Sequence, residues 1–306
     1  MALLLFGAAC VTRVCLRLLD INWEQGDFMY QGRIWLLVVS AVMLVSSQLA
    51  LAAEVSPPAV HQAPPRQVFA AFNLKYIEMD DLVKKLDDYT IIDLRPSFSY
   101  DVLHIKGAHS ISFSTTQNEF VSEVKKLVQK TKKPVVFYCN FKLCVMAFKA
   151  AVYMKNAGMS NVLVFDTGIM PMAKEHPTDC VLEGKPMESA SQLITKAEFD
   201  SHLLSPDKIM SLINADPNAA IIDIREKWQR AGISWFQMRD VNIPYSDAPA
   251  LKSTILKAKD QGRTLYFLDV KGKQVVWLQY WLKSNNVKNY WFVKGGAAAM
   301  INSLQN

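Results

Sequence analysis

An internal repeat is the feature that most constrains this chain. The repeated stretches are YTIIDLR at 89–95 and AAIIDIR at 219–225, KPVVFYC at 133–139 and RTLYFLD at 263–269, and NVLVFDTG at 161–168 and NYWFVKGG at 289–296. The first two pairs are offset by 130 residues and the third by 128. Because three segments recur in the same order, the sequence predicts two copies of one structural unit.

Strand and helix signals alternate within each copy. The apolar runs are short and rich in Val, Ile, Phe and Tyr, which is typical of strands buried on both faces of a parallel sheet. Stretches with apolar residues at helical spacing lie between them, for example at 118–130 and 145–157. The sequence therefore predicts an α/β fold with a central parallel sheet flanked by helices in each of two domains. Functional side chains are expected at the carboxyl ends of the strands.

The first fifty residues are typical of an export signal. Arg33 precedes an uncharged apolar stretch, 34–45, and the small residues at 50–53 offer a cleavage site, most plausibly after Ala52. We expect an upstream extension over 1–28, a signal peptide over 29–52 and a Pro/Ala-rich linker over 53–66. The alternative is an uncleaved anchor, since residues 34–53 carry no charge and are long enough to cross a bilayer. Both interpretations predict a periplasmic or otherwise extracytoplasmic protein.

The repeat also predicts the domain boundaries. They are 67–178 for the first domain, 179–192 for a linker and 193–306 for the second domain. The net charge of +6, from 34 basic and 28 acidic residues, is too mild and scattered for a dedicated nucleic-acid surface. It is compatible with small anionic substrates or acidic partners. A membrane contact is expected only through an uncleaved signal.

Five cysteines lie at positions 10, 15, 139, 144 and 180. They lack the density of a disulfide scaffold and the C-x-x-C pairs of a structural zinc site. We therefore expect neither a metal nor a cofactor.

Motifs of the first copy carry a resemblance. Residues 91–96, IIDLRP, and 103–108, LHIKGA, form a pattern that resembles the D-x-R strand end and the G-H-I-x-G-A stretch of the rhodanese family. Residues 135–139, VVFYC, with the loop after them and the helix from Val145, resemble that family's active-site strand, loop and helix. The resemblance covers 67–306 as two tandem rhodanese-like domains. It implies a sulfurtransferase, in which a cysteine carries a sulfane sulfur as a persulfide.

Cys139 matches the sulfur-carrying cysteine of that family. The active-site loop then comprises Asn140, Phe141, Lys142 and Leu143. Backbone N–H groups of such a loop, running into a helix N-terminus, favour a thiolate and hold anions, and Lys142 adds positive charge. The alternative is that Cys139 is a small buried hydrophobic residue.

The loop departs from the family pattern at two positions. Lys142 stands where the family has glycine, and Cys144 stands where it has arginine. Loss of the guanidinium weakens the case for thiosulfate as the donor. Cys144 is a candidate resolving thiol that could form a disulfide with Cys139, or else a small core residue in the first helical turn.

The second copy has Asp269 in place of the cysteine. A carboxylate cannot carry a sulfane sulfur, so we expect this copy to be inactive in transfer. Asp93 and Arg95 recur as Asp223 and Arg225 even in this copy, which favours a structural ion pair near the site. The further predictions are that Cys180 is a linker thiol without a partner and that Trp277 and Trp281 belong to a core or domain contact.

Three functions remain open at this point. The first is an exported sulfurtransferase that cycles through a Cys139 persulfide, with a small sulfur-containing anion and a thiol acceptor as partners. The second is a thiol redox protein, or a handler of sulfur or selenium oxyanions, that uses Cys139 and Cys144; an extracytoplasmic address favours it because disulfides persist there. The third is a non-catalytic scaffold that binds another exported protein.

Overall fold

The computed structural model describes residues 66, 69, 72–113, 116–141, 144–230, 234–236 and 239–304. The predicted upstream extension, the signal peptide and nearly all of the 53–66 linker lie outside the described residues, as do Lys142 and Leu143. No helix in the described part of the chain is long and apolar enough to cross a membrane. We call the described residues up to 192 the first half and those from 193 onward the second half.

The first half is built on a parallel sheet of five strands. In spatial order these are β1 (Lys75–Tyr76), β6 (Val162–Phe165), β5 (Val135–Tyr138), β2 (Thr90–Asp93) and β4 (His109–Ser110). All four pairings are parallel, and Asp93 pairs with Tyr138 at the carboxyl ends of β2 and β5. β2 and β5 are buried along their whole length, as expected of strands covered on both faces.

The second half repeats this arrangement. Its strands, in the corresponding spatial order, are β9 (Leu203–Leu204), β13 (Tyr290–Val293), β12 (Leu265–Leu268), β10 (Ala220–Asp223) and β11 (Val241–Asn242). All pairings are again parallel. The predicted α/β class with two parallel sheets is therefore confirmed, while the domain boundaries remain a prediction.

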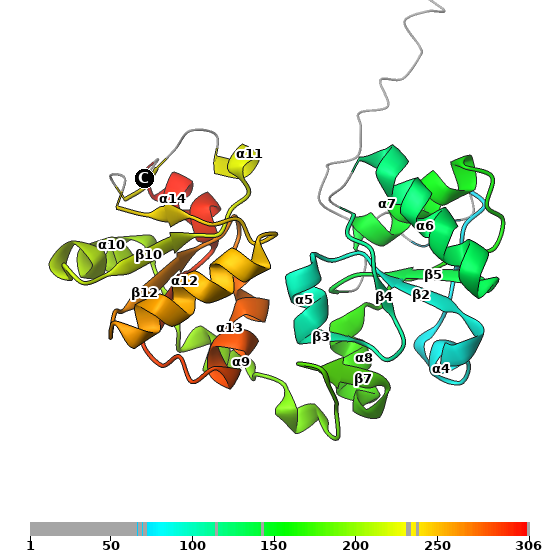
Figure 1. The fold of residues 1–306 in the computed structure, drawn as a ribbon, viewed down its shortest axis with the longest axis horizontal. Coiled ribbons are helices and arrows are strands. Elements are labelled where there is room, and N and C mark those ends of the chain that lie inside the picture. Colours follow the sequence, from blue (N-terminus) through cyan, green and yellow to red (C-terminus); the bar gives the residue numbers. More distant parts are fainter. Residues whose placement is uncertain are drawn as a thin grey trace, which may run out of the picture. The chain divides into compact units, whose positions relative to one another are not determined.

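Helices flank both sheets (Figure 1). Those of the first half are α4 (Met79–Val83), α5 (Ser97–Val102), α6 (Gln117–Thr131), α7 (Val145–Asn156) and α8 (Ile169–Glu175), with short 3₁₀ turns η1 (Leu86–Asp88) and η2 (Pro177–Asp179). A further 3₁₀ turn, η3 (Ala190–Gln192), ends the first half. The helices of the second half are α9 (Lys196–Asp200), α10 (Pro206–Ala215), α11 (Lys227–Arg230), α12 (Ala248–Asp260), α13 (Val275–Ser284) and α14 (Gly296–Ser303). The helices predicted at 118–130 and 145–157 are confirmed within one residue at each end.

Alternating strand residues build two cores on the two faces of the first sheet. Phe137 packs with Phe120 and Val124 of α6 and with the alanines of α7. Tyr138, the next residue, packs on the opposite face with residues of α5 and α8. Helix α6 begins with a capping box in which Thr116 and Glu119 satisfy each other's backbone N–H groups. This packing fixes the carboxyl end of β5, where the candidate loop begins.

The segment predicted as a linker, 179–192, carries regular structure. Strands β7 (Cys180–Leu182) and β8 (Lys185–Pro186) form a hairpin that extends β3 (Leu103–Ile105) in a small antiparallel sheet. The hairpin turn, Glu183 and Gly184, has positive φ at both residues (49° and 77°), as a two-residue turn of this kind requires. Cys180 is thus a fully buried core residue, because β7 packs it under the first half.

The two halves share a buried contact through α5. The Phe98 ring lies 4.8 Å from the Tyr245 ring and 6.5 Å from the Trp281 ring, centroid to centroid. The Ser99 and Tyr245 hydroxyl groups form a hydrogen bond of 3.0 Å. Trp277 is 1% exposed, so the tryptophans of α13 belong to the core and to this contact, as the sequence predicts.

Candidate active site around Cys139 and Cys144

Strand β5 delivers Cys139 at its carboxyl end. The backbone N–H of Ile169 donates to the Cys139 carbonyl (2.9 Å), and that of Met170 donates to the Asn140 carbonyl (3.2 Å). Gly168 allows this close approach, because a Cβ built there would lie 2.8 Å from the Phe141 nitrogen. The first residues of α8 therefore fix the backbone of Cys139 and Asn140, where the loop begins.

Helix α7 delivers Cys144 as its N-cap residue. The sulfur makes no capping hydrogen bond of normal geometry, but the backbone N–H groups of Met146 and Ala147 lie toward it and stabilise its ionised form. The positive end of the helix dipole acts in the same direction. Cys144 is therefore placed where a helix favours a negative charge.

Cys139 and Cys144 are both free cysteines, and their side chains interact with each other. The Cys139 thiol hydrogen-bonds to Cys144; this bond, followed by the helix N–H groups and the charge of Lys273, lowers the pKa of Cys144 to about 7. The same hydrogen bond and burial raise the pKa of Cys139 well above its ordinary value. The negative charge of the pair therefore lies on Cys144.

This distribution corrects the expectation that the loop favours a thiolate on Cys139. Cys139 is only 2% exposed, so ionising it would place a charge in a nearly dry environment. Cys144 is half-buried and lies directly at the helix N-terminus. The sequence pattern locates the loop but does not distinguish the solvation of its two cysteines.

Asp93 and Arg95 form a fully buried ion pair beside the thiols. The Arg95 Nη2 and Nε atoms donate to the Asp93 carboxylate at 2.6 and 2.9 Å. Nη2 also donates to the Leu103 carbonyl, and Nη1 donates to Asn140 Oδ1 at 3.4 Å. The guanidinium thus ties β2, β3 and the loop together. Its charge is matched by Asp93, so it is not a free cation for an anionic ligand.

The second half repeats the ion pair without the thiols. Arg225 Nε and Nη2 donate to Asp223 at 2.9 and 2.7 Å, nearly the same distances as in the first half. A pair that occurs beside both loops, with and without cysteine, serves the local fold in each.

Asp269 occupies the position of Cys139 at the carboxyl end of β12. Its Oδ1 accepts the Gly272 N–H at 2.5 Å, and its Oδ2 accepts the Gln274 N–H at 2.8 Å. The side chain is 1% exposed, and this burial raises its pKa even though the N–H groups act in the opposite direction. The carboxylate therefore fills the loop that an external anion would otherwise occupy.

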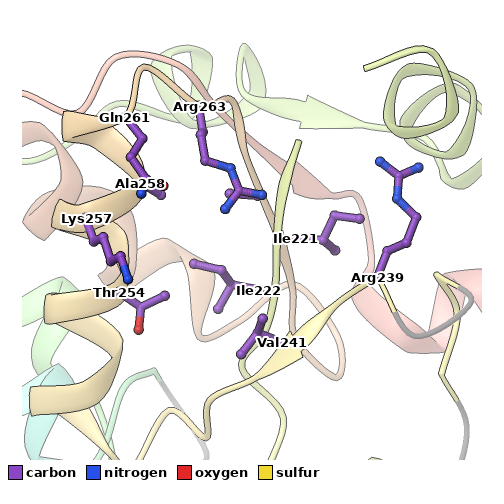
Figure 2. A pocket seen from close by; sticks show the side chains of 10 residues that line it. Ile221, Ile222, Arg239, Val241, Thr254, Lys257, Ala258, Gln261 and Arg263 are labelled. Atoms are coloured by element: carbon purple, nitrogen blue, oxygen red, sulfur yellow. The ribbon is translucent and has the colours of Figure 1, made fainter. Parts of the chain in front are cut away.

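A separate cavity of about 360 Å³ lies in the second half beside β10, β11 and α12 (Figure 2). Arg239 and Arg263 are among its lining residues, but both guanidinium groups donate to backbone carbonyls, Arg239 at 3.1 Å and Arg263 at 2.6 and 3.2 Å. No cysteine lines the cavity.

Among the described residues, no group of three or more His, Cys, Asp or Glu side chains could hold a metal ion.

Comparison with known proteins supports a family for the first half. Residues 78–175 match the model of the Rhodanese-like domain, a span that includes Cys139 and Cys144. A curated relative, the tRNA uridine(34) hydroxylase of Salmonella newport (strain SL254), is 29% identical over 101 residues. That alignment covers 32% of this chain and only 28% of the relative.

Two solved structures also resemble the chain. The As-Sb reductase from Leishmania major has 25% identity and a TM-score of 0.32, covering 36% of this chain and 86% of that one. The thiosulfate sulfurtransferase from Pseudomonas aeruginosa has 15% identity and a TM-score of 0.32, covering 75% of this chain and 44% of that one. With such scores, these likenesses add nothing to the family match. Residues 78–175 are thus similar to a rhodanese-like domain, and membership of the whole chain in that family stays a prediction.

Proposed function

We propose that this chain is an exported rhodanese-like sulfurtransferase that carries a sulfane sulfur as a persulfide on Cys139. The observation that carries the proposal is the interacting pair of free cysteines at the start of α7, in which the pKa of Cys144 is lowered to about 7 and that of Cys139 is raised. Such a pair can supply a nucleophilic sulfur near neutral pH without a metal ligand or a histidine.

In the sulfur-capture step, Cys139 takes the sulfur atom and Cys144 takes the proton. The Cys139 sulfur attacks the sulfane sulfur of the donor while its proton passes to the Cys144 thiolate. The S–S bond between the sulfane sulfur and the rest of the donor breaks, and the donor residue, sulfite if the donor is thiosulfate, leaves with the electron pair. The products are a Cys139 persulfide anion and a neutral Cys144 thiol.

Delivery reverses these roles. An acceptor thiolate attacks the outer sulfur of the persulfide, and the bond between that sulfur and Cys139 breaks. Cys139 leaves with the electron pair and recovers its proton from Cys144, so that the starting pair is restored. In this scheme Cys139 is the carrier and Cys144 is the proton acceptor and donor.

The contact between the two thiols favours a second candidate, a thiol redox protein. The Cys144 sulfur can attack the inner sulfur of a Cys139 persulfide, which forms a Cys139–Cys144 disulfide and releases hydrosulfide. An external thiol reductant must then reduce the disulfide before another cycle. Both candidates assign no transfer chemistry to the second half, because Asp269 offers no sulfur.

Intact mass after incubation with thiosulfate tests the proposal. We expect a gain of about 32 Da, reversed by a thiol reductant, that is lost in Cys139→Ser. Cys180→Ala is the matched control, because Cys180 lies outside the pair, and it should keep the gain. A loss of about 2 Da with a peptide linking Cys139 to Cys144 would favour the redox candidate. No mass change in any variant would leave the scaffold hypothesis.

A further inference from the structure

We propose that Lys273, from the loop of the second half, is the cation of the thiol site: it stabilises the Cys144 thiolate and attracts the anionic sulfur donor. The part that concerns the donor rests on the proposed function. The part that concerns the thiolate does not.

The first half has no free arginine to do this. Cys144 occupies the position where the resemblance implies an arginine. The Arg95 guanidinium contacts the loop at Asn140. Its other N–H groups donate to the Asp93 carboxylate and to the Leu103 carbonyl, so it is already paired. Lys142 lies outside the described residues, and the described part of the first half offers no unpaired guanidinium for a thiolate at the start of α7.

The start of α13 contacts the arginine that is hydrogen-bonded to the thiol loop. The Arg95 Cζ atom, which belongs to the network around Asn140, lies 4.8 Å from the Trp277 ring centroid. Trp277 is in the first turn of α13, four residues after Lys273. The Phe98 contacts with Tyr245 and Trp281 hold α5 and α13 together on the same side. The loop that precedes α13, with Lys273, therefore lies on the side of the second half that faces Arg95 and Asn140.

Asp269 fixes the backbone on both sides of Lys273. The residues directly before and after it, Gly272 and Gln274, donate their N–H groups to the Asp269 carboxylate. The Lys273 side chain is exposed and has no ion-pair partner among the described residues. Its charge acts on Cys144 and lowers the pKa of that thiol. The loop of the second half, in which Asp269 replaces the cysteine, thus supplies a lysine that acts on the thiols of the first half.

The test is the pH dependence of Cys144 alkylation by iodoacetamide, resolved by peptide mass spectrometry in the full chain. We expect Lys273→Ala to shift the profile to higher pH and to slow alkylation about two- to fivefold at pH 7, the range of an exposed charge pair. Lys273→Arg should restore the profile. High salt should remove the difference between Lys273→Ala and the unaltered chain, because salt screens exposed charges.

Matched variants keep the test decisive. Lys271→Ala removes an exposed lysine two residues earlier in the same loop and should not move the profile. Lys142→Ala tests the lysine of the thiol loop itself. An unchanged profile in Lys273→Ala, or a shift in Lys142→Ala alone, would overturn the assignment.

The donor part has its own measurement. With thiosulfate, Lys273→Ala should raise KM severalfold relative to Lys271→Ala, since the donor is a dianion. If no variant, including the unaltered chain, takes up sulfur while the Cys144 profile still shifts, the proposed function fails and the role of Lys273 at the thiolate stands. If KM is unchanged while sulfur is taken up, Lys273 does not attract the donor.

Discussion

At the scale of single residues, the site depends on which of two neighbouring thiols is ionised. The sequence predicts Cys139 as the reactive residue from its position after a buried strand, and Cys144 as its partner. The pairing follows from the tight loop between them. The location of the charge does not, because it depends on the 2% exposure of Cys139 and on the N-cap position of Cys144, which only the folded chain shows.

The hydrogen bond between the thiols gives a prediction for Cys139→Ala. Loss of the Cys139 donor removes the largest cause of the low pKa of Cys144, so this pKa should rise from about 7 toward the ordinary value of a thiol. Below the pKa the thiol is protonated and unreactive, so alkylation of Cys144 at pH 7 should slow. Its pH profile in Cys139→Ala, compared with Cys180→Ala, measures the effect. An identical midpoint in both variants would contradict the hydrogen bond.

The buried ion pair gives a second prediction. Arg95→Ala leaves the Asp93 carboxylate buried without a partner, which should lower the free energy of unfolding by about 3–5 kcal/mol. Lys84→Ala is the control, because the pair of Lys84 and Asp81 is exposed and 3.7 Å long, and it should have no measurable effect. Urea unfolding monitored by far-UV circular dichroism compares them. Equal midpoints would show that Asp93 finds another partner.

At the scale of elements, the long strands and helices could be predicted and the short ones could not. The composition of the unbroken apolar runs predicts β2, β5, β10 and β12. The helical spacing of apolar residues predicts α6 and α7. The hairpin of β7 and β8 has strands of three and two residues, too short for a periodic signal. The Glu183–Gly184 turn is the only sequence feature that indicates the hairpin. Because turn-forming residues are also typical of linkers, this feature does not distinguish a hairpin from a linker.

The turn before α8 gives an element-scale prediction with a matched control. Gly168→Ala places a Cβ 2.8 Å from the Phe141 nitrogen and forces a positive φ of 82° on alanine, so it should displace the thiol loop. Gly184→Ala also forces a positive φ, 77°, on alanine, but its Cβ meets nothing within 4 Å. Only Gly168→Ala should shift the Cys144 alkylation profile. If both variants shift it, the close approach at Gly168 is not the cause.

At the scale of the whole molecule, the repeat predicts two sheets with one strand order. It does not predict how the copies meet, because the contact of Phe98 with Tyr245 and Trp281 joins residues that are not equivalent in the two copies. It also does not reveal Lys273, an ordinary exposed lysine in a loop that lacks the cysteine. What distinguishes this lysine is its neighbourhood in the folded protein.

Processing of the chain is the prediction that concerns its full length. If the signal over 29–52 is cleaved after Ala52, the mature protein should begin at Ala53 and be recovered from an extracytoplasmic fraction. N-terminal sequencing of the protein from fractionated cells measures this directly. Recovery of the intact N-terminus with the membranes would favour the anchored alternative, and recovery from the cytoplasm would contradict both.

The carboxylate of Asp269 has a consequence for how the two loops respond to their surroundings. Its oxygens already satisfy the N–H groups around Gly272 and Gln274, so the second loop needs no bound ion to be ordered. In the proposed cycle, the charge of the thiol loop changes with each proton and each sulfur atom that is taken up or released. If that cycle operates, mutations around Asp269 should change the reactivity of the thiols without replacing a reacting atom.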